Sequence, residues 1–164
     1  MRTCFIITLL QPKQSRQLED FLTLGFGESF RPLACDYIAC MFSDDYHKPA
    51  FLVCEEEGAI IGAAAISEEL FTVNTWGISW LAVHPDHQKQ GLGSQMIEGC
   101  VEEIARRIKV PSTVILAVYD AIAPFYYKAG FSGTTRVHDE GGGLYLTRAV
   151  LPKLASSTIA RPAL

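Results

Sequence analysis

The chain has 164 residues, of which 49% are hydrophobic and 20% are charged, a composition that fits one ordinary globular domain and leaves little room for a second. The formal net charge of -4 argues against a nucleic-acid partner or an anionic membrane surface, since both need clustered Lys and Arg. Five cysteines without a Cys-x-x-Cys pair, and no stretch of roughly 18 apolar residues, predict reduced thiols in a cytoplasmic protein.

The first half of the chain predicts one strand, two helices and a strand pair. Residues 4–10 form an apolar run that is typical of a strand. The apolar positions of residues 13–26 repeat with the spacing of an amphipathic helix, and a shorter helix is predicted over residues 33–42. Residues 50–67 then predict two strands joined as a hairpin at residues 56–58, which read Glu-Glu-Gly.

The second half predicts strands that alternate with helices. Residues 75–83 are expected to form a strand, residues 91–109 a long helix, and residues 124–129 a short helix that ends at the turn of Gly130. A last pair of strands is expected around the glycine run at residues 141–143.

Two further expectations concern which faces of the strands are covered. Residues 112–120, STVILAVYD, are nearly all apolar and are expected to form a central strand covered on both faces. In the strand of residues 75–83, Trp76 and Trp80 alternate with Ile78, so we expect these side chains to share one face and to pack in the core.

This order of elements predicts an α/β (α+β) fold with a mixed, mostly antiparallel central sheet of about six to seven strands and helices on both faces. No internal repeat, linker or low-complexity segment interrupts the chain. Residues 1–164 are therefore expected to form a single domain. We expect the tail after Pro152, within residues 150–164, to be partly flexible.

A glycine-punctuated loop, VHPDHQKQGLGSQM, joins the predicted strand to the long helix. Gly91 and Gly93 at such a junction let backbone N–H groups converge, and the helix N-terminus adds partial positive charge, so the loop predicts an anion site, most often for phosphate. The alternative is a helix that happens to begin with Gly-Leu-Gly. A nucleotide-triphosphate loop is excluded because Ser94, not Lys, follows Gly93, and a dinucleotide fingerprint would need its third glycine at Met96.

Two blocks of the sequence resemble the GNAT acetyltransferase superfamily. The segment LAVHPDHQKQGLGSQMIE resembles the acetyl-CoA motif of that family, whose core of Gln or Arg, two residues, Gly, one residue, and Gly or Ala matches residues 88–93. The segment YDAIAPFYYKAGF resembles the family's second block, with Asp120 where Asn is usual. An Asp carboxylate can accept a hydrogen bond but cannot donate one. The resemblance covers residues 50–150, and the first 50 residues match only in having a strand followed by helices.

The resemblance implies acetyl-CoA as co-substrate. Its pyrophosphate would lie on the backbone N–H groups of residues 88–94, with glycines at positions 91 and 93 because a Cβ there would obstruct close approach. Its pantetheine would lie like an extra strand between residues 75–83 and 112–120. The implied cofactor-binding residues are Leu81, Ala82, Val83, Gln88, Lys89, Gln90, Gly91, Leu92, Gly93, Ser94 and Asp120. His84 and His87 have no third ligand nearby, so no metal is predicted.

The second block also implies a catalytic residue. Tyr126, four residues before Gly130, matches the tyrosine that gives a proton to the departing thiolate in many relatives; the alternative is a plain core tyrosine. Tyr127 points about 100° away around the helix. Many relatives carry a Glu in the strand before the glycine loop, but residues 75–83 hold no carboxylate. The base is left open among Glu68, Glu69, His84 and an ordered water.

The predicted function is an acetyl-CoA-dependent N-acetyltransferase in which a primary amine of a small molecule or peptide attacks the thioester directly. The alternative is a non-catalytic acyl-CoA-binding or regulatory domain. No nucleic-acid or membrane partner is expected, and a homodimer is left open. The side chains considered for an acceptor ammonium group are Glu28, Asp36, Asp44, Asp45, Tyr46 and His47.

Overall fold

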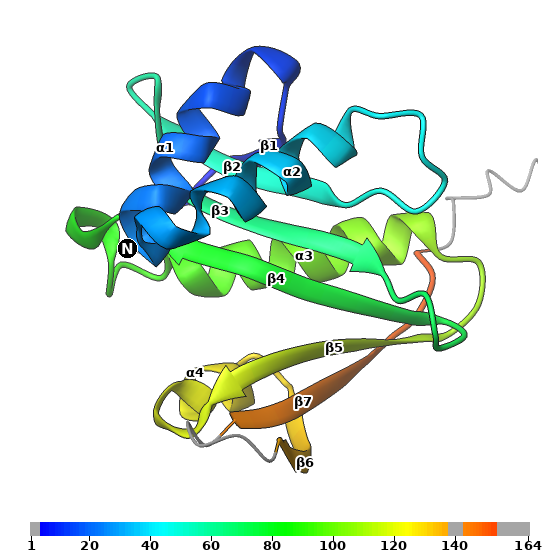
Figure 1. Ribbon diagram of the computed structural model, residues 1–164. Coiled ribbons are helices and arrows are strands. Elements are labelled where there is room, and N and C mark those ends of the chain that lie inside the picture. Colours follow the sequence, from blue (N-terminus) through cyan, green and yellow to red (C-terminus); the bar gives the residue numbers. More distant parts are fainter. Residues whose placement is uncertain (1–3, 138–142, 154–164) are drawn as a thin grey trace, which may run out of the picture.

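The computed structural model describes residues 4–137 and 143–153 (Figure 1). Seven strands form one sheet in the order β1-β2-β3-β4-β5-β7-β6: β1 (Ile7–Leu9), β2 (Ala50–Glu56), β3 (Ala59–Glu68), β4 (Thr75–Val83), β5 (Ser112–Tyr119), β6 (Ser132–Val137) and β7 (Gly143–Val150). The helices are α1 (Ser15–Phe26), α2 (Arg31–Met41), α3 (Leu92–Arg107) and α4 (Ala123–Lys128). Only β4 and β5 pair in parallel, so the predicted mixed, mostly antiparallel sheet is confirmed for the described residues.

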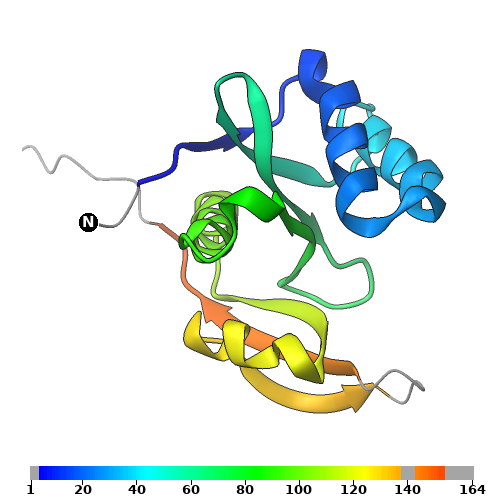
Figure 2. The same ribbon diagram turned by 90° about the vertical axis from the view of Figure 1, so that its left-hand side faces the viewer.

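Helices cover both faces of the sheet, as predicted, and each face has its own core (Figure 2). On one face, α1 and α2 bury Leu18, Leu22 and Ile38 with the side chains of β2 and β3. On the other face, α3 and α4 pack against the opposite sides of the same strands and against β5 and β7. Small residues in β3 allow this double packing: a Cβ at Gly62 would lie 3.2 Å from a methyl group of Leu92.

The hairpin predicted at residues 56–58 is present between β2 and β3. Glu57 and Gly58 both have positive φ, 51° and 79°, which is the two-residue turn geometry that matches the twist of antiparallel strands. The first strand is shorter than predicted, because β1 pairs with β2 only from Ile7 to Leu9. Part of the predicted glycine run and nearly all of the predicted tail lie outside the described residues.

Two expectations about strand faces are wrong. Burial alternates along β5: Val114 and Leu116 are buried against α3 and α4, while Ala117 on the other side is exposed. An apolar run cannot show that α1 and α2 stop short of β5. Trp76 and Trp80 lie on opposite faces of the sheet, because a β-bulge interrupts β4 between them.

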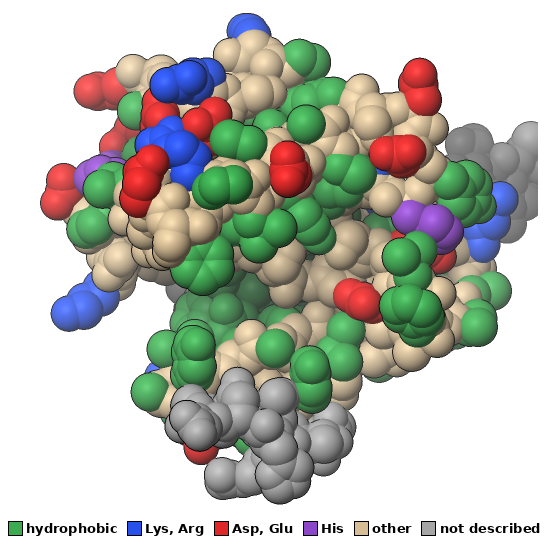
Figure 3. Space-filling model, in the orientation of Figure 1, with side chains coloured by type: hydrophobic (Ala, Val, Ile, Leu, Met, Phe, Trp, Pro, Cys, Tyr) green, Lys and Arg blue, Asp and Glu red, His purple; other side chains and the backbone are tan. Residues whose placement is uncertain are grey.

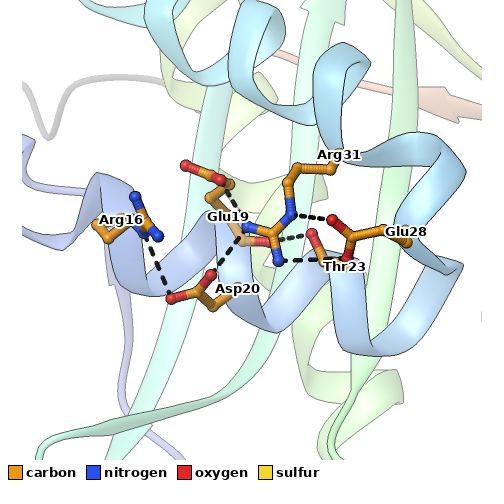
Figure 4. A network of polar contacts seen from close by, with 6 residues as sticks. All are labelled: Arg16, Glu19, Asp20, Thr23, Glu28 and Arg31. Carbon is orange, nitrogen blue, oxygen red and sulfur yellow. Dashed lines mark hydrogen bonds and ion pairs between the residues drawn. The ribbon is translucent and has the colours of Figure 1, made fainter.

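A charged network holds α1 against α2 (Figure 4). Arg31, at the start of α2, lies 2.6 Å from a Glu19 oxygen, 2.9 Å from an Asp20 oxygen and 2.7 Å from a Glu28 oxygen. Hydrogen bonds from Arg31 hold the pKa values of Glu19 and Asp20 below their usual range. Glu28, considered above for an acceptor ammonium, therefore already has a cationic partner.

Candidate active site

The strands β4 and β5 separate and form a fork. They pair only from Thr75–Gly77 to Thr113–Ile115, and beyond Gly77 each continues for several residues without pairing to the other, as Figure 1 shows. Backbone groups on the inner edges of a fork lack sheet partners. The fork therefore offers hydrogen-bonding sites to an extended ligand between the two strands.

A β-bulge at Trp80 changes which face of the sheet the side chains of β4 point to. Trp80 has a φ of +54°, in the left-handed region that bulky residues rarely adopt, and the β3–β4 register shifts between Ala63 and Ala65. The bulge inverts the facing of side chains, so Ser79 and Trp80, adjacent in sequence, both face the α1–α2 side. This explains why Trp76 and Trp80 do not share a face.

Beyond the bulge, the backbone of Leu81 and Val83 faces the fork. The His84 N–H donates to the Ile61 oxygen at 2.8 Å, and in an antiparallel pair such bonds recur at every second residue. Ala82 therefore directs its backbone groups to β3, and its two neighbours direct theirs away from β3. Among the predicted cofactor contacts on β4, Leu81 and Val83 have the required orientation and Ala82 does not.

The glycine loop brings the end of β4 to the start of α3. Lys89 and Gly91 have positive φ values of 60° and 90°, which turn the chain into the helix at Leu92. By α-helix geometry the first N–H groups of α3 have no acceptor within the helix, and its dipole adds partial positive charge there. This geometry suits an anion, as the sequence predicted.

A pocket of about 350 Å³ lies where the fork, the glycine loop and α4 meet. It is lined by Leu81, Val83, Gln88, Lys89, Gly91, Gly93, Ser94 and Phe125, so the fold brings together seven of the eleven predicted cofactor residues. A Cβ at Gly93 would lie 3.3 Å from the Phe125 ring and would project into this space. Phe125 was not predicted as a site residue; its position in the second sequence block, beside Tyr126, is the signal that could have found it.

The other four predicted cofactor residues, Ala82, Gln90, Leu92 and Asp120, do not line this pocket. Leu92 is 1% exposed and packs in the core, and the Gln90 side chain donates to the Asp86 oxygen at 2.9 Å. Asp120 begins the short 3-10 helix that follows β5. A neighbouring pocket of about 510 Å³ shares Gly91 and Ser94 with the first and is bordered by Lys128.

Tyr126 lies on α4 and is 8% exposed. Its ring packs edge-on against Phe125 and Phe131, with centroid distances of 4.9 and 6.1 Å. No described residue forms a hydrogen bond with its hydroxyl, and no described side chain buries a polar atom without a partner, so this hydroxyl keeps some contact with solvent. Burial, and to a lesser degree Cys100, raises the pKa of Tyr126 to about 12. Tyr127 is half-exposed.

A second pocket, of about 400 Å³, opens on the face that α1 and α2 partly cover. Figure 3 shows a hollow on this face, below the two helices. Of the base candidates, only Glu69 lines the pocket: Glu68 lies 4.0 Å from His47 and His84 lies 3.7 Å from Asp86. None of the six acidic, Tyr and His side chains considered for an acceptor lines it.

None of the helices in the described part of the chain has the length and apolar composition needed to span a bilayer. Within residues 4–137 and 143–153, no group of three or more His, Cys, Asp or Glu side chains is placed to hold a metal ion.

The family model described as "Acetyltransferase (GNAT) domain" matches residues 47–133. Comparison with curated proteins gave no match. Similar solved structures include an aminoglycoside 6'-N-acetyltransferase complexed with coenzyme A, which has a TM-score of 0.73 and 14% identity over 92% of this chain and 99% of that chain. Another is the ribosomal-protein-S18-alanine N-acetyltransferase from Escherichia coli, with a TM-score of 0.71 and 16% identity over 95% and 99% of the two chains. A GNAT acetyltransferase from Streptococcus pneumoniae has a TM-score of 0.69 and 16% identity over 90% and 99%.

Proposed function

Because the chain belongs to the GNAT acetyltransferase family, we propose that it transfers an acetyl group from acetyl-CoA to a primary amine. The observation that carries the proposal is the fork between β4 and β5, which opens beside a glycine loop and a helix N-terminus. An extended amide chain fits the fork, and a pyrophosphate fits the loop. In acetyl-CoA, the pantetheine chain carries the thioester at one end and is joined to the pyrophosphate at the other.

The residues of the fork and loop fit this cofactor. The backbone groups of Leu81 and Val83 would bind the pantetheine amides in the manner of a neighbouring strand. The N–H groups from Leu92 to Ser94 would bind the pyrophosphate. The Gln88 N–H, also predicted to do so, already donates to the Pro85 oxygen at 3.2 Å. The pocket bordered by Lys128 gives a cation and space for the remaining phosphate-bearing part of the molecule.

The chemistry follows from direct attack. The bound thioester supplies an activated acetyl group. The acceptor ammonium must lose one proton, through water or a base, to become a nucleophile. It loses a second proton to solvent as its nitrogen bonds to the carbonyl carbon and the C–S bond breaks. Tyr126 would give its hydroxyl proton to the departing sulfur and recover one from solvent. Its place beside Phe125, which lines the cofactor pocket, supports this role.

Gly93 gives the sharpest test of the cofactor site. Gly93→Val would place methyl groups against Phe125 and in the pocket, and Gly93 does not have the positive φ that makes any change at Gly91 strained. We expect millimolar acetyl-CoA to raise the melting temperature of the wild type by mass action and to leave that of the variant unchanged. A wild-type melting temperature that does not respond to acetyl-CoA would refute the proposal.

Turnover needs its own measurement. Release of free CoA thiol in the presence of a panel of amines separates an enzyme from a non-catalytic acyl-CoA-binding domain. The absence of a carboxylate from β4 is the feature that keeps this alternative in view. Acetyl-CoA binding without release of CoA thiol in the presence of any amine of the panel would favour the non-catalytic alternative.

A further inference from the structure

The pocket on the α1–α2 face lies across the sheet from the cofactor pocket. Its lining residues are Tyr37, Ser67, Glu69, Phe71, Thr72, Thr75, Gly77, Ile78, Ser79, Ile115, Leu116, Ala117 and Tyr145. They come from α2, from β3, from both strands of the fork, from β7 and from the β3–β4 connection. Glu69 is the one acidic member, and none of these described residues is Lys, Arg or His. The pocket is therefore suited to one positive charge.

Glu69 occupies this pocket because β4 has a glycine opposite it. Its N–H donates to the Thr75 oxygen at 2.9 Å, which folds the start of the connection back over β4. A Cβ at Gly77 would lie 2.5 Å from the Glu69 Oε1 atom, so the carboxylate rests on the bare backbone of the strand. No described residue forms a hydrogen bond or ion pair with this carboxylate. The adjacent Glu68, by contrast, lies beside His47.

The carboxylate also lies at the inner end of the fork. Gly77 and Ile115 are the last residues of β4 and β5 that pair before the strands separate. A thioester carried into the fork from its open end would approach this point. An ammonium group held by Glu69 would thus lie close to the acetyl group.

The rest of the pocket is apolar or carries hydroxyl groups. Tyr37, Phe71 and Tyr145 contribute aromatic rings, and Ile115 and Ala117 contribute the uncovered face of β5. Phe71 is 98% exposed, so its ring borders the mouth of the pocket and has almost no contact with the protein. Apolar surface of this kind is more stable when a ligand covers it, and aromatic rings also favour a neighbouring cation.

We propose that this pocket binds the acceptor, that Glu69 binds its ammonium group, and that the acceptor is a monoamine with an aromatic or aliphatic body. The inference rests on the proposed function and deepens it. A single carboxylate balances a single charge, so a second ammonium group would lie against apolar walls. An α-amino acid would bring its own carboxylate next to Glu69, with no basic side chain among the described lining residues to receive it.

The matched probes are phenethylamine and phenylalanine, which differ only in the carboxylate, together with spermidine as a polycation. CoA thiol release at saturating acetyl-CoA is measured for each. We expect phenethylamine to have a kcat/KM at least about tenfold above that of the other two probes. A higher kcat/KM for phenylalanine or spermidine would overturn the inference. So would the absence of CoA thiol release with phenethylamine as acceptor, if acetyl-CoA still stabilises the protein; neither result would contradict the cofactor site. Failure of acetyl-CoA to bind would instead overturn the proposed function.

Three variants test the role of Glu69. Glu69→Gln removes the charge and should raise the KM for phenethylamine about tenfold or more, as expected for a lost charged hydrogen bond, while the KM for acetyl-CoA stays the same. Gly77→Ala should act in the same direction, because its methyl group displaces the flexible end of Glu69 and does not meet the backbone of the strand. Glu68→Gln is the control and should leave both KM values within about twofold.

The pattern across these variants separates binding from structure. An unchanged phenethylamine KM in Glu69→Gln would overturn the assignment. So would an equal rise in the two KM values, or a loss at Glu68→Gln as large as at Glu69→Gln. Addition of Glu69→Gln to Gly77→Ala should cause little further loss, since both changes remove the same contact.

Discussion

Replacement of Tyr126 by Phe tests the proposed general acid with the least disturbance to the fold. The ring keeps its edge-on contacts with Phe125 and Phe131, and only the hydroxyl is lost. Because no described residue forms a hydrogen bond with that hydroxyl, the free energy of unfolding should change by less than about 1 kcal/mol. A loss of activity in this variant would therefore report on chemistry, not on stability.

The structure sets the size of the expected loss. Burial raises the pKa of Tyr126 to about 12, which makes this hydroxyl a weaker acid than a free tyrosine but leaves its pKa roughly 4 pH units below that of water, about 15.7. If about half of that difference is expressed in the rate, replacement of the tyrosine by solvent costs ~10²-fold, at the lower end of the usual range for a positioned acid. This corresponds to about 3 kcal/mol in the barrier.

The assay is release of CoA thiol at saturating acetyl-CoA and acceptor, with acetyl-CoA affinity measured separately by calorimetry. Tyr127→Phe is the matched control, since that hydroxyl is on a half-exposed side chain of the same helix and its loss should be nearly silent. Wild-type kcat in Tyr126→Phe, or a larger loss in Tyr127→Phe, would show that solvent or another residue supplies the proton.

Arg31→Met should lower the melting temperature at pH 7, and its difference from the wild type should shrink as the pH falls. The reason is that the pKa values of Glu19 and Asp20 are held below 4.5 and 3.8, and the stability that their ion pairs add is lost as the two carboxylates protonate. An equal difference in melting temperature at pH 7 and pH 3 would contradict this. Burial raises the pKa of the Cys100 thiol from 9.0 to about 12, so the unfolded chain releases this proton first and the free energy of unfolding should fall between pH 9 and 12 by up to ~4 kcal/mol. Urea titrations should show a smaller fall in Cys100→Ala. Phe125→Ala should weaken acetyl-CoA binding about tenfold with the circular dichroism spectrum unchanged, and equal affinity would remove this ring from the site.

Those parts of the fold that depend on short-range signals could be predicted from sequence. The limits of β4 match the predicted strand at Thr75 and Val83, because the flanking segments lack alternation and a proline follows. The hairpin at Glu57 and Gly58 has the turn that its composition indicates. The family prediction is confirmed, since its motif lies within one continuous strand-loop-helix segment.

What could not be predicted depends on long-range packing. Nothing in the alternation of β4 reveals that Trp80 adopts a left-handed backbone conformation, so its side chain was expected on the wrong face. The exposed side of β5 depends on where α1 and α2 end in space. The placement of Glu69 over Gly77 needs the β3–β4 connection to fold back on the strand, and no local pattern encodes that contact. The sequence therefore could not distinguish Glu69 from the other three alternatives for the base.

The orientation of Leu81 and Val83 assigns cofactor recognition to the main chain and leaves acceptor recognition to side chains. In the proposed binding mode, the strand recognises the cofactor through peptide groups, which are the same whichever residue stands at these positions. In the same proposal, the pocket on the opposite face would recognise the acceptor through side chains. Substitutions in that pocket would then change the choice of acceptor and leave the donor half of the site as it is. A chain of this size could in that way acquire a new substrate without changes to the residues that bind acetyl-CoA.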